Sequence, residues 1–373
     1  MSCFDLVIAG GGPVGLVTAI AARLAGLSAL VLERATELPE KACGEGLMPA
    51  AVRTLEELGV QLDGGRAFRG VRFIDAGVTA SASFGEAPGY AINRRGLMLA
   101  LRTRADRLGV EVRSGHTVRE FHYQHGAVTV SARVRGGQEL SFRGRLLVAA
   151  DGLRSPIRRR LGLELTRSGA PRFGLQRHFQ CAPWSDWVEV HWHDRAEAYV
   201  TPLGDQELGV ALLMHGNELD YAGALKLFPE LAARLGEGHS DRVRGAGPLE
   251  QRAQSVLAPG VALVGDAAGY LDALTGEGLA IGFGSAVALV QRFGRGELWK
   301  YPDDHAALTA AYLGMTRLML ACSRAPALRR WSVRFLSARP RLFSRLLRVV
   351  SDPPPAHLDA PLHFRAALGR VLA

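Results

Sequence analysis

The sequence predicts an α/β (α+β) fold in which a parallel sheet is assembled from separated parts of the chain. Three stretches carry this prediction, because each is an apolar strand that ends in a Gly-containing turn and leads into a helix: residues 4–24, 146–158 and 261–286. Between the second and third stretches, residues 165–254 contain strands of alternating apolar and polar side chains, which predict an antiparallel sheet. Beyond residue 300, apolar residues recur at near-helical spacing and predict C-terminal helices.

The first stretch has the order strand, Gly-rich turn, helix, strand and acid, which is the order of the dinucleotide-binding fingerprint. Its glycines allow a tight turn, the approach of a pyrophosphate to the backbone and close helix–strand packing. The helix N-terminus offers free N–H groups, and the acid at the end of the second strand can accept hydrogen bonds from the adenosine ribose. The residues expected to contact the cofactor here are Gly10, Gly12, Pro13, Val14, Gly15, Glu33 and Arg34.

Two further strands end in acidic residues, Asp151 and Asp266, where ligands of α/β folds bind. Asp266 can receive a ribityl hydroxyl. The Gly-rich backbone that follows it opens a helix, and such an N-terminus can stabilise negative charge on the edge of a flavin ring. The contacts expected from these two stretches are Asp151, Gly265, Asp266, Gly276, Gly278 and Leu279.

A loop at residues 41–49 holds a lone cysteine, Cys43, among glycines and a proline. One interpretation makes Cys43 a small loop residue, and the other places its thiol beside the cofactor. The loop composition leaves both interpretations open.

Composition disfavours several other classes of protein. The net charge is +9, but only three of the 45 basic residues are Lys, which suggests coding habit, and no nucleic-acid motif is present. The cysteines lack CxxC spacing, and His191 and His193 lack a third ligand, so we expect no metal site. The N-terminus runs directly into a strand, and no apolar run reaches the roughly 18 to 20 residues that span a bilayer. We therefore expect a cytoplasmic protein without a signal peptide or a transmembrane segment.

Residues 305–351 contain nine Arg and no Asp or Glu. One interpretation is a set of helices packed on the body with an Arg-rich outer face. The other is a surface, between Arg317 and Arg348, that lies on a membrane or docks an acidic carrier protein. We prefer the first because the Arg bias extends over the whole chain.

In this order, the three stretches resemble the flavoprotein family of p-hydroxybenzoate hydroxylase type, which includes aromatic hydroxylases, flavin halogenases and geranylgeranyl reductases. The resemblance covers about residues 1–300. The motifs that carry it are Gly10-x-Gly12-x-x-Gly15 with Glu33, Ala150-Asp151-Gly152-x-x-Ser155-x-x-Arg158, and Gly265-Asp266-Ala267-Ala268.

This resemblance implies a tightly bound FAD, with Cys43 and Gly44 on the flavin side and Arg94 near the FAD phosphates or the flavin. It also implies a Rossmann-type FAD-binding domain that is split in sequence, an antiparallel β-sheet substrate domain and C-terminal helices. The expected boundaries are residues 1–70, 93–164 and 255–300 for the FAD-binding domain, 71–92 and 165–254 for the substrate domain, and 301–373 for the C-terminal region.

Within the family, Cys43-Gly44-x-Gly46 is similar to the reductase branch, in which a loop Cys helps to protonate the substrate. The Tyr-x-Trp-x-Phe-Pro stretch of that branch has only a faint counterpart at residues 199–202. The spelling of residues 43–49 is also similar to bacterial monooxygenase-like oxidoreductases of polyketide or redox-cofactor biosynthesis, and we favour that branch.

We therefore expect an FAD-dependent monooxygenase, with NAD(P)H as transient reductant, that hydroxylates an aromatic or polyketide-type substrate through a flavin C4a-hydroperoxide in secondary-metabolite or cofactor biosynthesis. One alternative is an FAD-dependent reductase of isoprenoid double bonds, with Cys43 as the catalytic proton donor. A third possibility is a non-catalytic flavin-binding protein. The expected partner is a small aromatic or lipid-like molecule.

Overall fold

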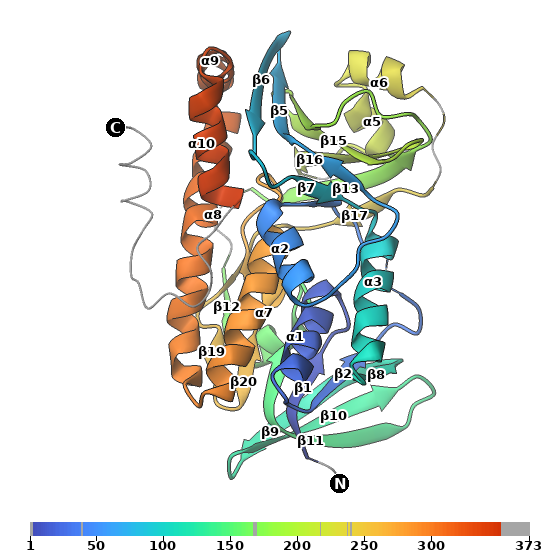
Figure 1. The fold of residues 1–373 in the computed structure, drawn as a ribbon, viewed down its shortest axis with the longest axis vertical. Coiled ribbons are helices and arrows are strands. Elements are labelled where there is room, and N and C mark those ends of the chain that lie inside the picture. Colours follow the sequence, from blue (N-terminus) through green and yellow to red (C-terminus); the bar gives the residue numbers. More distant parts are fainter. Residues whose placement is uncertain are drawn as a thin grey trace.

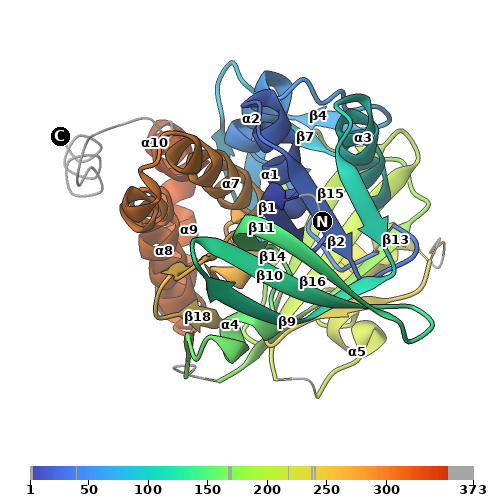
Figure 2. The same ribbon diagram turned by 90° about the horizontal axis from the view of Figure 1, so that it is seen from below.

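Two large β-sheets organise the computed structural model, one above the other along its long axis (Figure 1). The C-terminal helices lie along one side of the sheets, as the view from below also shows (Figure 2). The residues that the structure describes are 3–38, 40–166, 170–216, 218–236, 238 and 241–351.

The lower sheet in Figure 1 has the parallel core predicted from the Gly-containing stretches. Its strands are β1 (Cys3–Ala9), β2 (Ala29–Glu33), β8 (Glu111–Ser114), β9 (His116–Gln124), β10 (Ala127–Val134), β11 (Glu139–Ala149), β19 (Leu257–Ala258) and β20 (Val261–Leu263). The order is β19-β20-β11-β1-β2-β8, with β10 and then β9 added to β11. The pairs β1–β2, β1–β11, β2–β8 and β11–β20 are parallel, so their carboxyl ends meet at one edge.

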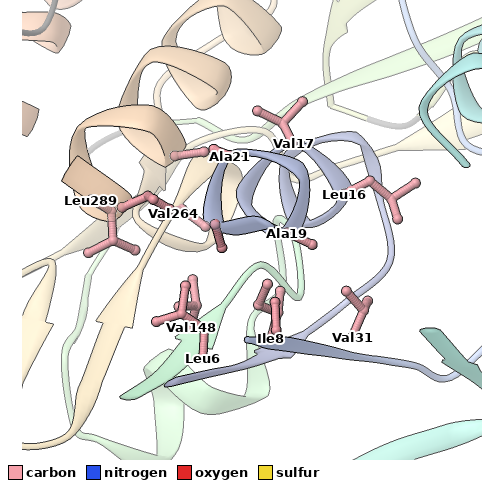
Figure 3. Packing of buried hydrophobic residues seen from close by; sticks show 14 of the residues in the cluster. Leu6, Ile8, Leu16, Val17, Ala19, Ala21, Val31, Val148, Val264 and Leu289 are labelled. Carbon is pink, nitrogen blue, oxygen red and sulfur yellow. The ribbon is translucent and has the colours of Figure 1, made fainter. Parts of the chain in front are cut away.

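Helices cover this sheet: α1 (Pro13–Leu24), α2 (Pro49–Glu57), α3 (Arg94–Arg107), α4 (Pro156–Arg160) and α7 (Gly278–Gly294). Pro13 suits the first turn of α1 because its missing N–H has no partner there, and Gly26, with φ +78°, lies just past its end. Figure 3 shows α1 over the strands that carry Ile8 and Val148, which are fully buried. Burying each such side chain contributes about 1.5–3 kcal/mol, so this contact holds the Gly-rich turn in place.

β11 is one continuous strand that begins at Glu139, seven residues before the second predicted stretch. Its first half pairs antiparallel with β10, and its second half pairs in parallel with β1. Gly144 pairs with Phe4 of β1 on one side and with Val128 of β10 on the other. A Cβ at this position would lie 2.8 Å from the Val7 side chain. Gly144 therefore marks a close approach of strands rather than a turn.

The upper sheet is mostly antiparallel, as predicted for residues 165–254. Its strands are β5 (Gly70–Asp75), β6 (Val78–Ser83), β13 (Arg172–Phe179), β14 (Val188–Trp192), β15 (Ala196–Gly204), β16 (Glu207–His215) and β17 (Arg244–Ala246). The order is β17-β13-β16-β15-β14-β5-β6, and the β14–β5 pair is parallel. Helices α5 (Tyr221–Leu225) and α6 (Pro229–Leu235) pack on it.

Two small sheets and a short turn of helix join the large sheets. One small sheet contains β3 (Gly46–Leu47), β7 (Gly89–Ala91) and β4 (Arg66–Phe68). The other contains β12 (Glu164–Leu165), β18 (Gln251–Ala253) and β21 (Gly269–Tyr270). The 3-10 turn η1 (Gly265–Ala267) follows β20 and carries the predicted Asp266.

The C-terminal region contains η2 (Leu298–Lys300), α8 (Tyr301–Ser323), α9 (Pro326–Ser337) and α10 (Pro340–Ser351). Arg329 of α9 is buried and donates to Asp75 of β5 over 2.8 Å, while Phe343 of α10 packs on Phe73. This region is therefore packed against the upper sheet through Ser351, and residues 352–373 lie outside the described residues.

α8 corrects the expectation that no segment has the length and apolar character of a membrane span. Residues 298–323, within the part of the chain that the structure describes, pass that test by length and composition, and 22% of their most apolar window is buried. Core helices of soluble proteins, which are mostly buried, pass the same test, so one such helix is weak evidence of a membrane span. Here Tyr301, Tyr312 and Thr316 are buried against the body of the protein.

Candidate active site

The Gly-rich turn between β1 and α1 has the geometry that its three glycines predicted. Gly10 has φ +107°, and a Cβ there would lie 2.4 Å from the carbonyl oxygen of Ala150. A Cβ on Gly15 would lie 1.9 Å from the Gly10 carbonyl oxygen, whereas a Cβ on Gly12 would have no neighbour within 4 Å. Gly10 and Gly15 therefore serve packing, and Gly12 leaves open space at the N-terminus of α1, which also begins with Pro13 and Val14.

Glu33 lies beside this turn at the end of β2. One carboxylate oxygen accepts a hydrogen bond from the Gly11 N–H over 2.6 Å, and the other accepts one from the Ala35 N–H over 2.8 Å. These bonds hold the carboxylate next to the α1 N-terminus. Arg34 follows Glu33 at the same edge of the sheet, and its side chain is exposed.

Buried Arg158 joins the second and third predicted stretches. Its guanidinium donates to the carbonyls of Asp266 and Ala267 over 3.3 and 3.0 Å, and to that of Leu153 over 2.9 Å. Arg158 belongs to the recognised Asp-Gly motif, but we had not assigned it a role. Its contacts indicate that it holds the turn bearing Asp266 at the edge of the sheet.

Asp151 and Asp266 lie at neighbouring strand ends of that edge. The Ile157 N–H donates to one oxygen of Asp151 over 3.1 Å, and the other oxygen is buried without a partner among the described residues. Burial raises the pKa of both carboxyls, and in Asp266 the charges of Arg94 and Lys41 oppose that effect. Two half-buried carboxyls at one edge are suited to receiving ligand hydroxyls.

Arg94 begins α3 and has the clearest mark of a missing anionic partner. Its Nε and Nη1 atoms are buried and have no hydrogen-bond partner in the described ranges. A buried guanidinium without acceptors is costly, so its donors point to a ligand that carries negative charge. Together with the open N-terminus of α1, these donors fit the phosphates or ring edge of FAD.

A cavity of about 210 Å³ connects this edge to the upper sheet. Its cofactor side includes the predicted residues Cys43, Gly44, Arg94, Asp266, Gly276, Gly278 and Leu279. Its opposite side is formed by apolar side chains, among them Phe68, Val188, Val190 and Leu213. The predicted residues around α1, together with Asp151 and Gly265, lie outside this cavity. Gly265 packs against Val14.

Cys43 lines the cavity. Its thiol is free and half-buried, and its sulfur accepts a hydrogen bond from the Glu45 N–H over 3.3 Å. The structure thus places a thiol in the wall of a cavity that apolar side chains line on the opposite side.

Three side chains that we had not predicted lie in a row behind this cavity. Glu45 lines the cavity, and its Oε2 atom is 2.7 Å from His178 Nε2. His178 Nδ1 is 2.7 Å from Asp241 Oδ2. Proximity to Cys43 could have drawn attention to Glu45, but no sequence signal relates it to residues more than 130 positions away.

The alternation predicted for residues 165–254 places Glu189 at a polar position of β14, but this position is not solvated. Its carboxylate is buried, pairs with Arg72 over 3.2 Å and accepts from the Trp184 indole over 3.0 Å. These partners and His191 bring the pKa of Glu189 down to about 2, although burial acts in the opposite direction. No group of metal-ligating side chains was found in the described residues.

The comparison with known proteins gives a match to a family model and matches to individual relatives. A family model described as FAD binding domain matches residues 4–207. Digeranylgeranylglycerophospholipid reductase 1 of Methanopyrus kandleri is 31% identical over 299 residues, which cover 74% of this chain and 76% of that protein. Phenazine 1,6-dicarboxylic acid hydroxylase PhzS of Lysobacter antibioticus is 39% identical over 172 residues, 42% of each chain.

Among solved structures, p-nitrophenol 4-monooxygenase PnpA from Pseudomonas putida DLL-E4 has a TM-score of 0.82 at 19% identity. The match covers 96% of this chain and 99% of that one. At this identity the likeness concerns the fold.

Proposed function

The chain belongs to the flavoprotein superfamily of p-hydroxybenzoate hydroxylase and geranylgeranyl reductase, with FAD as its cofactor, and on that premise we propose that it is an NAD(P)H-dependent monooxygenase. The substrate that we infer is an aromatic or polyketide-type compound with a ring hydroxyl and an otherwise apolar surface. The coarser assignment, an FAD-dependent oxidoreductase, is common to the hydroxylase and the reductase among its relatives.

The observation that carries the proposal is the cavity between the cofactor edge and the apolar face of the upper sheet. Its roof includes Phe68 and Val190, which are almost fully buried, and its floor is the backbone around Gly276 and Gly278. When bound, FAD supplies the redox chemistry with NAD(P)H and O₂. That chemistry needs a site from which water is excluded, and an apolar roof supports this requirement.

The chain's own residues would bind and orient the reactants. The Arg94 guanidinium is suited to hold negative charge of the cofactor, and the N-terminus of α7 is suited to the ring edge. Val188, Val190 and Leu213 would position an apolar ring by contact area. The apolar wall opposite the predicted cofactor residues also supports a catalytic protein, because in a non-catalytic flavin-binding protein we would expect side chains to fill this space.

Reduction of an isoprenoid double bond is the second candidate, and Cys43 favours it. Its thiol faces the same cavity, and the relative that matches 74% of this chain is named as a phospholipid reductase. In such a reaction the Cys43 S–H would give its proton to a carbon of the substrate, and solvent would restore it.

The two candidates differ in oxygen use. FAD-loaded protein should be supplied with NADH or NADPH and with phenols, alkylresorcinols, quinols and polyprenyl compounds, while O₂ consumption, peroxide and products are measured. The monooxygenase proposal expects one O₂ and one NAD(P)H consumed per hydroxylated product. Anaerobic loss of a double bond, with no oxygen incorporated aerobically, would contradict it.

The Cys43→Ser variant also distinguishes the reductase from the monooxygenase. Cys181→Ser, which lies outside the cavity, is the matched control. A hydroxyl is a far weaker acid than a thiol of pKa about 8.5, so a reductase should lose turnover while retaining FAD. A monooxygenase should keep most of its hydroxylation rate, because no thiol proton enters that step. An inactive Cys43→Ser variant with full FAD occupancy and normal flavin reduction would favour the reductase.

We also propose that the surface between Arg317 and Arg348 is the Arg-rich outer face of packed helices, and we keep contact with a membrane or an acidic carrier as the alternative. Leu318, Leu328 and Trp331 are exposed on it, which supports a contact beyond simple solvation. Co-sedimentation with vesicles that contain phosphatidylglycerol should be lost at high salt if the contact is electrostatic.

A further inference from the structure

A row of charged side chains leads from the cavity to the surface. Glu45, His178 and Asp241 have side chains that are 2%, 12% and 18% exposed, so access to water increases in the order in which they contact one another. Both contacts are 2.7 Å long. Asp241 also pairs with Arg244, which reaches exposed Glu40. The row therefore begins at the cavity wall and ends in contact with solvent.

The backbone holds Glu45 at the cavity wall in a conformation that non-glycine residues seldom adopt, with φ +59°. Its carbonyl accepts from the Ile92 N–H over 3.0 Å, and Oε1 accepts from the Arg94 N–H over 2.8 Å. The Gln176 amide donates to Oε2 over 3.2 Å. Such a conformation costs about 1–3 kcal/mol and persists where the surroundings over-determine it, which is frequent at functional sites.

We propose that Glu45, His178 and Asp241 are a proton relay that exchanges a proton between the compound in the cavity and solvent. The proposal rests on the proposed function, because a site without chemistry has no proton to exchange. It deepens that function by assigning Glu45 as the group that meets the substrate hydroxyl. His178 and Asp241 act through Glu45 and are positioning and conducting residues.

The proton transfer balances. The O–H bond of the substrate hydroxyl breaks, its electron pair stays on oxygen, and the proton bonds to a carboxylate oxygen of Glu45. His178 passes its Nδ1 proton to Asp241, which releases it to water, and the neutral ring keeps its Nε2 proton. The ring then takes the Glu45 proton at its free Nδ1 after turning to bring that nitrogen towards Glu45. Turning back restores the starting state of each group, and one proton has left the cavity.

The charges that face His178 agree with a start from the doubly protonated ring. Glu45 comes from the loop before β3, Asp241 from the loop before β17, and Glu207 of β16 lies 4.0 Å away. Burial alone would lower the pKa of His178, but these carboxylates raise it to about 9. At neutral pH both ring nitrogens therefore carry protons, one directed at each end of the row.

A second cluster of buried charged side chains serves as a structural network for comparison with this row. Arg172 pairs with Glu197 and Asp272 over 2.7 and 2.8 Å, and the three side chains are at most 4% exposed. None of these three side chains lines the cavity beside Cys43. Of these two networks of described residues, the Glu45 row is the one that combines a cavity end with an exposed end.

The test uses FAD-loaded full-length protein and the phenol of the substrate panel that turns over fastest. Glu45→Gln should lower kcat by about 100-fold or more, the range for loss of a general base, with FAD occupancy unchanged. His178→Ala should cause a similar loss, and added imidazole should restore at least about a tenth of it. Asp106→Asn, which breaks the half-exposed Arg102–Asp106 pair outside the cavity, is the control and should retain full activity.

Two outcomes would overturn the relay. One is full kcat in folded Glu45→Gln. The other is a His178→Ala loss that imidazole does not restore, with a pH profile parallel to that of the wild type, as expected of a structural role. If the protein reduces polyprenyl compounds instead, the proposed function fails, but the same variants are tested with the relay running inwards as a proton supply.

A measurement independent of turnover covers a protein that converts neither class of compound. With ¹⁵N-histidine labelling, 4-nitrophenol as probe should shift the His178 ring nitrogens in the wild type and leave them unchanged in Glu45→Gln. Absence of any shift in the wild type at saturating probe would show that the cavity and the row are not connected, and the relay would be rejected.

Discussion

The cofactor half, which is the lower sheet with its helices, and the cavity half, which is the upper sheet with the residues around the cavity, differ in how far apart in sequence their contacting residues lie. At the cofactor edge, most contacts are local: Gly10, Gly15 and Glu33 lie within one β-α-β unit. In the cavity half, Glu45 meets His178 across 133 positions, His178 meets Asp241 across 63, and Arg172 meets Asp272 across 100. Short-range sequence patterns therefore predict the contacts of the cofactor half. The contacts of the cavity half form only when strands that are distant in sequence pack together.

The two halves also differ in the chemical groups that make their contacts. The cofactor half offers mainly backbone N–H groups and space, which glycine provides and any larger side chain removes. The cavity half offers buried charges, whose cost of desolvation must be offset by partners of opposite charge. The two halves should therefore respond to mutation differently, first in stability and then in cofactor affinity.

The largest effect is expected from Arg172→Met in the cavity half. Removing the cation leaves Glu197 and Asp272 buried without their partner, which should lower the free energy of unfolding by about 3–5 kcal/mol. Urea unfolding measures this loss. Arg66→Met, which breaks the half-exposed pair with Asp186, is the control and should cost less than about 1 kcal/mol. Equal effects of the two variants would contradict the contrast.

In the cofactor half, two glycines of one turn should separate stability from affinity. Gly15→Ala forces a Cβ against the Gly10 carbonyl and should destabilise the apoprotein by about 3 kcal/mol. Gly12→Ala meets no atom within 4 Å and should leave apoprotein stability unchanged, while FAD binding weakens by about 100-fold. Thermal unfolding of the apoprotein and flavin fluorescence titration distinguish the two. Unchanged FAD affinity in Gly12→Ala would exclude a pyrophosphate at this turn.

The charge of His178 should give the cavity half a pH-dependent stability. Because its pKa is raised from the usual 6.5 to about 9 in the folded state, its contribution is complete below pH 6.5 and is lost as the pH rises through 9. The contribution is at most about 3 kcal/mol. Unfolding free energies measured between pH 6 and 10 should decline in the wild type and decline less in His178→Ala. Parallel curves would show that His178 is not held by Glu45 and Asp241.

Glu33→Ala should produce the smallest of these effects and act mainly on the cofactor. Losing a charge-assisted hydrogen-bonding acid should cost roughly 1.5–3 kcal/mol, or about 10- to 150-fold in FAD affinity. Glu33→Gln keeps the acceptor oxygen for the Gly11 N–H and serves as the milder comparison. Retention of wild-type FAD affinity in Glu33→Ala would contradict a ribose contact.

Some sequence predictions failed for identifiable reasons. The second stretch was expected to begin at residue 146, yet β11 starts at Glu139, because Gly144 allows close strand packing and does not form a turn. The alternation of residues 165–254 places Glu189 among polar positions, but alternation does not show that Arg72 and Trp184 cover its side chain. In both cases a residue's surroundings in the fold overruled its local pattern.

By itself, the sequence determined the order of elements, the turn at Gly10–Gly15, the acid at Glu33 and the two strand ends that carry Asp151 and Asp266. These features are local because glycine conformation, strand burial and helix N-termini depend on neighbours in the chain. Tertiary structure alone decided that Cys43 faces a cavity, that Arg158 ties two loops together and that His178 lies between Glu45 and Asp241. Buried charges acquire their role from partners of opposite sign, and the fold brings those partners from distant parts of the chain.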